Sequence, residues 1–340
     1  MTIVISRDFA FHRIGEKVQN LSKSLFAITA MAAATALLST QAHGFGWSDK
    51  GTSGAQFLKI APGARIPAMG EAAAADCSDA YALYYNPAAL GRIKRPEAAL
   101  AHNSYFQGIR HDFGAFAVPM LSWTNSPRPG NAIGTLGFSV TSLSVGGIER
   151  RGVVETDAPS DTFGASDFAY TAGYGYALSQ ALAMGGSLKA IEQTLDSAHA
   201  SAFAADGGIL YGAGEFALGA GFRNMGGGVS LGSSPDPLPF LMYAGAAYRQ
   251  KGPLHLAVDV RMPRDHRVML SLGGEYRRPV GQGMSAALRA GYNSANTDPD
   301  GLTGVVAGAG LGYGNMEFDF AWIPFGDLGN TFRYSLQLKF

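Results

Sequence analysis

The chain has 340 residues, of which 46 are glycine and only 15% are charged, and its 26 basic residues equal its 26 acidic ones. Glycine at nearly twice its ordinary frequency of about 7% favours an exported strand-rich protein over a soluble enzyme. Because the basic residues are not in excess, nothing points to nucleic acid as a partner. The lone cysteine, Cys77, excludes an intrachain disulfide and a zinc cluster built from thiolates.

Residues 1–42 have the three parts of a signal peptide. Basic residues from Arg7 to Lys23 precede an apolar run from Leu25 to Leu38, and small residues follow up to Ala42. The run is shorter than the roughly 20 residues that a transmembrane helix needs. We therefore expect export with cleavage near Ala42 and no helical anchor, and the alternative is a short buried helix.

Residues 43–95 lack regular alternation and are expected to form turns and short helices. Asn86 followed by Pro87 suits a helix start, because the asparagine side chain can cap the helix. Proline at the first helical position loses no hydrogen bond there. A structural role for this pair is therefore favoured over a role in binding a ligand.

Several short motifs in this segment carry a resemblance to a known family. They are Gly63-Ala64-Arg65, Met69-Gly70-Glu71-Ala72, Asp79-Ala80-Tyr81-Ala82-Leu83-Tyr84-Tyr85 and Asn86-Pro87-Ala88-Ala89-Leu90-Gly91, together with the start from Gly51 to Leu58. They resemble the PorV/PorQ group within the FadL-like outer-membrane proteins. The resemblance implies a fourteen-stranded barrel with residues 43–95 folded into its lumen as a hatch.

The resemblance also indicates which hatch residues matter. The hatch motif would consist of Arg65, Met69, Gly70, Asp79, Asn86, Pro87 and Ala88. Arg65 differs from the others, because a lone cation inside a plugged lumen needs a carboxylate partner. The candidates for that partner are Glu275, Glu317 and Asp319.

From residue 96 the chain divides into short alternating segments separated by Gly, Pro, Asn and Asp, which is typical of antiparallel strands. An even number of strands is what a bacterial single-chain barrel requires. The expected fold is all-β, a transmembrane antiparallel up-and-down barrel over residues 96–340, probably of fourteen strands with a partly helical hatch. The predicted strands are 97–106, 111–120, 132–146, 165–178, 181–194, 200–212, 215–223, 239–250, 254–262, 266–277, 283–292, 304–313, 315–323 and 331–340.

The connections between these strands alternate in length. Those after strands four, six, eight, ten and twelve are short, whereas residues 147–164, 224–238 and 293–303 form long connections after strands three, seven and eleven. The connection 121–131 is an exception, since it is long on the short side. Outer-membrane barrels have short periplasmic turns and longer outer loops, so this alternation favours a barrel over a soluble sandwich.

Alternation also places charged side chains on one face of several strands, because successive residues of a strand point to opposite sides. The residues expected to face the lumen are Asp259, Arg261, Arg267, Glu275, Arg289, Glu317, Asp319, Arg333 and Lys339. Ion pairs that merely hold the interior together are favoured over a role in binding substrate. The glycine-rich strand 165–178 leaves room for something packed against the wall.

The chain ends in a segment in which apolar and polar residues alternate strictly. Its apolar face consists of Phe332, Tyr334, Leu336, Leu338 and Phe340. A terminal strand that closes on phenylalanine looks like the signal that outer-membrane barrels present to their assembly machinery. We therefore expect a multi-pass protein of the bacterial outer membrane, whose partners are membrane lipids and the barrel-assembly machinery.

No catalytic constellation is found: a phosphate loop, a Gly-x-Ser-x-Gly elbow and a His-Glu-x-x-His motif are all absent from the sequence. We expect no enzyme activity, no cofactor and no metal. The resemblance implies either a FadL-like channel that passes small hydrophobic compounds, or a PorV-like adaptor that works with secretion-system proteins in export and surface attachment. The channel is slightly favoured, with Gly134, Gly137, Gly146 and Gly147 as residues that could kink the wall into a lateral opening.

Overall fold

The computed structural model describes residues 50–121, 132–153, 157–232, 234–249, 252–296 and 304–340. The chain divides into two compact units, Met1–Gly46 and Trp47–Phe340. The first unit, with the predicted signal peptide, lies outside the described residues, as do residues 43–49 of the predicted hatch. Every structural statement that follows concerns the second unit.

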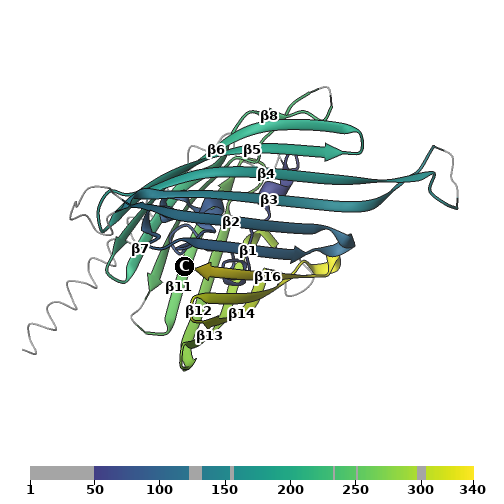
Figure 1. Ribbon diagram of the computed structural model, residues 1–340. Coiled ribbons are helices and arrows are strands. Elements are labelled where there is room, and N and C mark those ends of the chain that lie inside the picture. The colour runs from purple at the N-terminus through teal and green to yellow at the C-terminus, as the bar shows by residue number, and fades with distance from the viewer. Residues whose placement is uncertain (1–49, 122–131, 154–156, 233, 250–251, 297–303) are drawn as a thin grey trace, which may run out of the picture. The chain divides into compact units, whose positions relative to one another are not determined.

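Fourteen strands close into one antiparallel barrel, in which each strand pairs with its neighbour in the chain and the last strand pairs with the first. The prediction of an all-β barrel of fourteen strands is confirmed. The strands are β1 (Glu97–Ser104), β2 (Arg110–Leu121), β3 (Ala132–Arg150), β4 (Asp161–Ala177), β5 (Leu182–Leu195), β6 (Ala198–Ala213), β7 (Phe216–Gly226), β10 (Leu241–Arg249), β11 (Leu254–Pro263), β12 (Met269–Gly281), β13 (Met284–Asn293), β14 (Val305–Tyr313), β15 (Met316–Pro324) and β16 (Asn330–Lys339). Figure 1 shows β1 and β16 lying side by side.

The two ends of the barrel differ in their connections. At one end, which we call the short-turn end, β6 and β7, β12 and β13, and β14 and β15 are joined by two residues each. At the opposite, long-loop end, the connection from β7 to β10 contains a small ribbon of β8 (Gly228–Val229) and β9 (Asp236–Pro237). Short periplasmic turns are typical of outer-membrane barrels, so the short-turn end is assigned to the periplasm.

The boundaries predicted on either side of residues 147–164 are wrong. Residues 147–164 were expected to form a loop, yet β3 and β4 continue to pair through Ile148 with Phe163 and Arg150 with Asp161. The reason is a bulge between Val145 and Ile148, where Gly147 adopts a positive φ of 70° that glycine permits without strain. Pairing resumes beyond the bulge, and the two strands extend further at the long-loop end.

The two faces of the wall have opposite character. Large apolar side chains such as Leu188, Phe203 and Leu288 point outward and are about 70% exposed. Polar side chains such as Lys189, Asp206 and Arg289 point inward and are buried. An apolar outer face on a closed barrel matches a lipid environment and leaves no unpaired strand edge, as an outer-membrane protein requires. No helix within the described residues is long and apolar enough to cross a membrane.

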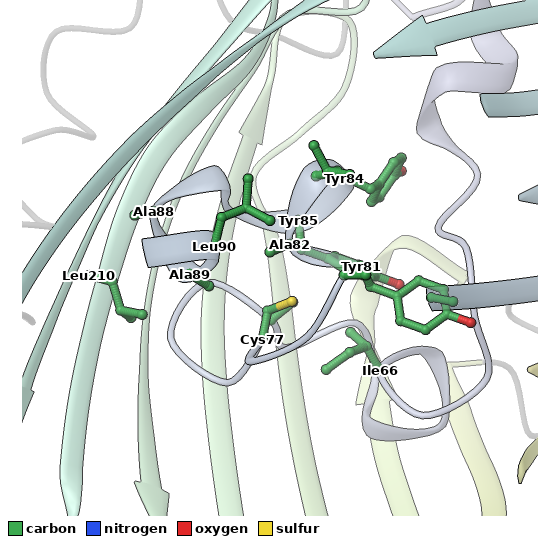
Figure 2. Close-up of a cluster of buried hydrophobic side chains, with 14 of the residues drawn as sticks. Ile66, Cys77, Tyr81, Ala82, Tyr84, Tyr85, Ala88, Ala89, Leu90 and Leu210 are labelled. Atoms are coloured by element: carbon green, nitrogen blue, oxygen red, sulfur yellow. The ribbon is translucent and has the colours of Figure 1, made fainter. Parts of the chain in front are cut away.

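The hydrophobic core lies inside the barrel, between the wall and the hatch, which we define as residues 50–95. The hatch contains short helices only: η2 (Gln56–Lys59), η3 (Pro67–Met69), α2 (Ala82–Tyr85) and η4 (Pro87–Arg92). Its Leu83, Tyr85 and Leu90 are buried against small wall residues such as Ala183 and Ala217. Figure 2 shows this cluster, with Ala88, Ala89 and Leu90 near Leu210 of β6. The expected partly helical hatch in the lumen is therefore found over residues 50–95.

Candidate functional site

The hatch crosses the lumen from the long-loop end to the short-turn end. The amide of Gly54 donates to the carbonyl of Pro237 at 2.9 Å, beside the β8–β9 ribbon. Further along, the amide of Ala64 donates to Ser335 Oγ at 3.1 Å, halfway down β16. Arg92 Nη2 then donates to the carbonyl of Ala181 at 2.7 Å, in the turn between β4 and β5. The chain therefore passes through the whole barrel before it enters β1.

Glycines in the wall let the hatch backbone lie directly on the strands. A Cβ atom at Gly175 of β4 would stand 2.5 Å from the amide nitrogen of Gly91, and one at Gly173 would stand 2.7 Å from Leu83. Such contacts are closer than real Cβ atoms allow, so no other residue fits without a shift. The same close approach recurs at Gly185 on Pro87, Gly219 on Ala74, Gly273 on Met69 and Gly291 on Gly70.

The Asn86-Pro87-Ala88 motif fastens η4 to both the hatch and the wall. The fully buried Asn86 side chain accepts from the amide of Ala88 at 3.1 Å, which caps the helix, and Pro87 occupies the first helical turn. The Nδ2 atom of Asn86 donates to the carbonyl of Ala74 at 2.7 Å and to that of Ile209 at 3.2 Å. These contacts stabilise the hatch, and the side chain does not line the cavity described below.

Met69 and Gly70 lie at the opposite side of the lumen from η4. Met69 is fully buried and ends η3, and Gly70 follows in the left-handed conformation with φ of 68°. Both residues rest on Gly273 of β12 and Gly291 of β13. A side chain at either wall position would displace the turn that carries the next residue, Glu71.

Asp79 and Cys77 form a small buried polar pair within the hatch. Asp79 Oδ1 accepts from the amide of Tyr81 at 3.0 Å and lies 3.7 Å from Cys77 Sγ. Burial raises the pKa of the Asp79 carboxyl, and burial followed by the nearby Asp79 charge raises the pKa of the Cys77 thiol well above its usual value. A thiol held in its neutral form is a poor nucleophile, so this site does not suit thiolate chemistry.

Arg65 joins the hatch to the wall through two carboxylates. Its Nη2 lies 2.7 Å from Asp76 Oδ2 of the hatch, and its Nε lies 3.2 Å from Glu275 Oε2 of β12. Of the three candidate partners taken from the sequence, Glu275 is in contact, whereas Glu317 and Asp319 pair with other arginines. Asp76, which also pairs with Arg249 of β10 at 2.9 Å, is a partner of Arg65 that the sequence pattern does not predict.

The other charges near Arg65 form one network on the inner wall of β12, β13 and β15. Glu275 lies 2.6 Å from Arg289 Nε and 3.2 Å from Arg277 Nε. Arg289 in turn lies 2.7 Å from Asp319, and Glu317 pairs with both Arg277 and Arg289. The inward placement of Glu275, Arg289, Glu317 and Asp319 follows from strand alternation.

The remaining lumen charges hold the hatch on the neighbouring strands. Asp259 Oδ2 accepts from the amides of Ala73 and Ala74, both at 2.7 Å. Arg261 pairs with Glu71 and donates to Asn293 at 2.7 Å. Arg333 and Lys339 also face inward on β16, where Lys339 lies 3.9 Å from Glu97 Oε1 of β1.

The placement of Arg267 is wrong. It was expected to face the lumen on a strand beginning at residue 266, but β12 begins at Met269 and Arg267 lies exposed in the preceding connection. There its Nη2 donates to the carbonyl of Ser294 at 3.2 Å, in the next loop. Alternation cannot place a residue beyond the end of a strand, because the two-residue period then stops.

On the outer face of β16, the side chains of Phe332 and Tyr334 are each 40% exposed and Phe340 is 61% exposed, while Leu336 and Leu338 are half-buried. The amide of Phe340 donates to the carbonyl of Pro96 at 2.9 Å and so completes the seam with β1. This outward aromatic row is accessible from the membrane, and its role as an assembly signal stays a prediction.

A cavity of about 290 Å³ lies between the hatch and the long-loop end. Its lining is mixed: Leu58, Ile60, Leu241, Met269 and Phe325 are apolar, whereas Arg223, Arg261, Arg333, Lys59 and Glu71 are charged. Asp265, in the connection after β11, accepts from Lys59 Nζ and from Gln56 Nε2. Burial alone would raise the pKa of Asp265, but these hydrogen bonds hold the pKa of that carboxyl below its usual value, which favours its charged form.

Arg223 is a cavity residue outside the predicted set of lumen charges, although the sequence pattern contains a signal for it. In β7, Ala217, Gly219, Gly221 and Arg223 share the inward face, so strict alternation places Arg223 in the lumen. The hatch residues Glu71 and Asp76 had no such signal, because turns and short helices carry no fixed period. Within the described residues, no group of three or more His, Cys, Asp or Glu side chains could hold a metal ion.

The suggested lateral opening is not present along the middle of β3. Its pairing with both β2 and β4 is unbroken from Thr135 to Ser144. Gly134 lies at an irregularity near one end of the strand and Gly146 and Gly147 lie at the bulge near the other, while Gly137 packs on Leu83 of the hatch. The glycines of β3 therefore bend its ends and admit the hatch.

Comparison with solved structures identifies the architecture. The Pseudomonas putida toluene transporter TodX superposes with a TM-score of 0.56 at 11% identity, covering 82% of this chain and 98% of that one. The Ralstonia pickettii toluene transporter TbuX gives 0.52 at 14% identity over 82% of this chain and 98% of that one. The chain shares its fold with these two transporters. CymD, a monoaromatic hydrocarbon channel, gives 0.55 at 12% identity over 83% and 98% of the two chains.

No family model matches the sequence, and no curated protein matches it either. At identities this low the structural likeness establishes the fold alone, and a fold does not by itself fix a function. The cargo must be argued from the site.

Proposed function

We propose that this protein is an outer-membrane channel for small hydrophobic compounds, with the hatch as its gate. The cavity at the long-loop end carries the proposal, because its apolar lining by Leu58, Ile60, Leu241, Met269 and Phe325 can accept an apolar molecule. Its volume of about 290 Å³ is near the lower end for small-molecule pockets, roughly 300–1,000 Å³. The names of TodX, TbuX and CymD, a toluene or hydrocarbon channel in each case, support the same class of cargo.

The hatch has the position of a gate. Beyond Glu71, toward the short-turn end, a void lined by Tyr84, Tyr85 and Asp259 measures only about 10 Å³. Such a space holds a single water molecule at most. Passage of a compound from the cavity along this route therefore requires residues 58–95 to shift relative to the wall.

Uptake by intact cells tests the proposal. The full chain is expressed in a bacterial host that lacks its own hydrocarbon channels, and initial uptake of radiolabelled toluene is compared with that of cells carrying an empty vector. We expect a several-fold faster uptake with the assembled barrel. Equal toluene uptake in both strains, with the protein present in the outer membrane, would remove the proposal of a channel for neutral hydrocarbons.

A deletion of residues 51–91 in the same host examines the gate. Without this plug the lumen should admit a small hydrophilic dye that the full chain excludes. Unchanged dye entry in a deletion variant that still forms a heat-modifiable barrel would contradict the gate.

As a second candidate we propose a PorV-like adaptor that holds secretion-system proteins. The motifs shared with the PorV/PorQ group support it, as does the position of the segment Gly51 to Leu58, which carries part of that resemblance. Gly54 of this segment bonds to Pro237 of β9, at the long-loop end where an external protein could make contact. A stoichiometric protein that co-purifies in mild detergent, in place of a lipophilic molecule, would favour this candidate.

A further inference from the structure

Three buried arginines from three separate strands meet at the cavity. Arg223 of β7, Arg261 of β11 and Arg333 of β16 all line it, and they are 8%, 7% and 2% exposed. In each of them the Nε atom is buried without a hydrogen-bond partner. Buried donors are normally satisfied, so an unpaired Nε on each of three arginines at one cavity needs an explanation.

Arg223 is held by aromatic rings rather than by an acid. Its guanidinium lies 4.6 Å from the ring centroid of Tyr84 and 5.7 Å from that of Tyr243. Its Nη1 donates a long hydrogen bond to the carbonyl of Tyr84 at 3.4 Å. Stacking on rings occupies the faces of the guanidinium and leaves its N–H edge for another acceptor.

Arg333 is likewise positioned by neutral groups. Its Nη1 donates to the carbonyl of Ala61 at 2.6 Å and its Nη2 donates to the hydroxyl of Tyr105 at 2.9 Å. Among the residues that the structure describes, no carboxylate lies within 4.0 Å of either Arg223 or Arg333. Both cations are buried without an ion-pair partner.

The acids around the cavity already have cations of their own. Glu71 pairs with Arg261, Asp265 pairs with Lys59, and Asp206, on β6 next to the strand of Arg223, lies 2.7 Å from Lys189. Asp259, on the other side of the hatch, accepts from two hatch amides. Positive charge therefore remains at Arg223 and Arg333, and a buried cation without a counter-ion is strongly unfavourable.

We infer that the cavity binds a small aromatic carboxylate, whose anionic group lies between Arg223 and Arg333. A carboxylate matches the planar N–H fork of arginine better than a spherical ion does. The rest of the molecule would lie on Tyr105 and Phe325, whose ring centroids are 6.0 Å apart and which both line the cavity. The inference rests on the proposed channel function and narrows the cargo to an anionic aromatic compound. The names of the structural neighbours refer instead to neutral hydrocarbons.

Binding of matched probes to the purified full chain in detergent tests the inference. Benzoate and benzamide have nearly the same shape and differ in charge, so calorimetric titration of both isolates the anionic group. We expect benzoate to bind at least tenfold more tightly than benzamide, and the preference to shrink in Arg223→Gln and in Arg333→Gln. The control is Arg278→Gln, which removes an exposed arginine over Tyr276 and should keep the full preference.

Several outcomes would overturn the inference. Equal affinity for benzoate and benzamide in the unaltered protein would do so without any variant, as would a preference that survives in both cavity variants. Inorganic phosphate or chloride binding as tightly as benzoate would show a site for a simple anion, not for this cargo. Uptake in cells, measured with radiolabelled toluene and with radiolabelled benzoate, decides the channel separately: uptake of either compound without a benzoate preference in binding defeats only the inference, and absent uptake of both compounds defeats the channel.

Discussion

At the scale of single residues, Arg65 connects the hatch to the wall. Its two carboxylate partners, Asp76 and Glu275, belong to the hatch and to β12 respectively. The side chain is 15% exposed, so solvent screens these ion pairs only weakly. The sequence indicated that Arg65 needs an acid, and Glu275 was among the candidates because alternation places it inside. Asp76 could not be anticipated, since it lies in a turn without periodicity.

Replacing Arg65 by methionine should loosen the hatch without breaking the barrel. Asp76 keeps Arg249 and Glu275 keeps Arg289 and Arg277, so neither acid is left alone. We therefore expect a loss of about 1–3 kcal/mol in local hatch stability, less than removing one partner of an isolated buried pair. Faster hydrogen exchange of the hatch amides with unchanged exchange in the strands is the measurement.

The exposed Arg278→Met is the matched control for this change and should leave hatch exchange unaltered. Equal exchange of the hatch in Arg65→Met and in the unaltered chain would mean that the ion pairs do not fasten it.

At the scale of elements, hatch and wall fit together through glycines on particular strands. Alternation showed that the glycines of β4 and β5 leave space inside the wall, but not which hatch residue fills it. Gly185 and Gly186 of β5 illustrate the point, because they are adjacent in sequence and point to opposite faces. A Cβ at Gly185 would overlap Pro87 of the hatch, whereas one at Gly186 would have its nearest neighbour, the carbonyl oxygen of Asp206, at 3.4 Å.

The substitution Gly185→Ala should therefore push η4 away from the wall, and Gly186→Ala should not. Overpacking of this kind costs about 1–3 kcal/mol, while a tolerated surface change stays within about 0.5 kcal/mol. Planar-bilayer recordings measure the result as leak: we expect frequent channel openings with Gly185→Ala and a closed baseline with Gly186→Ala. Identical closed baselines would show that the contact with Pro87 does not hold the gate shut.

At the scale of the whole molecule, the seam between β1 and β16 closes the wall. The register runs from Glu97 opposite Lys339 to Ser104 opposite Phe332, without interruption. Closure satisfies the backbone of both terminal strands, which could not otherwise lie in lipid. The exposed Phe340 contributes one backbone hydrogen bond to this seam, to Pro96.

Removal of Phe340 should impair assembly of the barrel in the outer membrane but leave the stability of the folded barrel nearly unchanged. One lost hydrogen bond costs about 0.5–1.5 kcal/mol, so the folded barrel should persist. If the outward aromatic row is the assembly signal, the yield of heat-modifiable barrel in the outer membrane should nevertheless fall several-fold. Lys339→Gln keeps the terminal aromatic residue and serves as the control, and a normal yield from the truncated chain would argue against the signal.

Alternation and connection length in the sequence were enough to predict the number of strands, their up-and-down order and the face that residues within the strands occupy. These features follow from a period of two and from connections too short to allow any other neighbour. The pairing of Arg65 with Asp76, the contact of Pro87 with Gly185 and the position of Arg223, Arg261 and Arg333 at one cavity became visible in three dimensions. Such contacts join residues as much as 271 or 272 positions apart, as in Ala64 with Ser335 and Ala61 with Arg333. Local periodicity predicts which face of the wall a side chain occupies. Closure of the barrel brings inward-facing side chains of distant strands close together, and this contact has no signal in a local pattern.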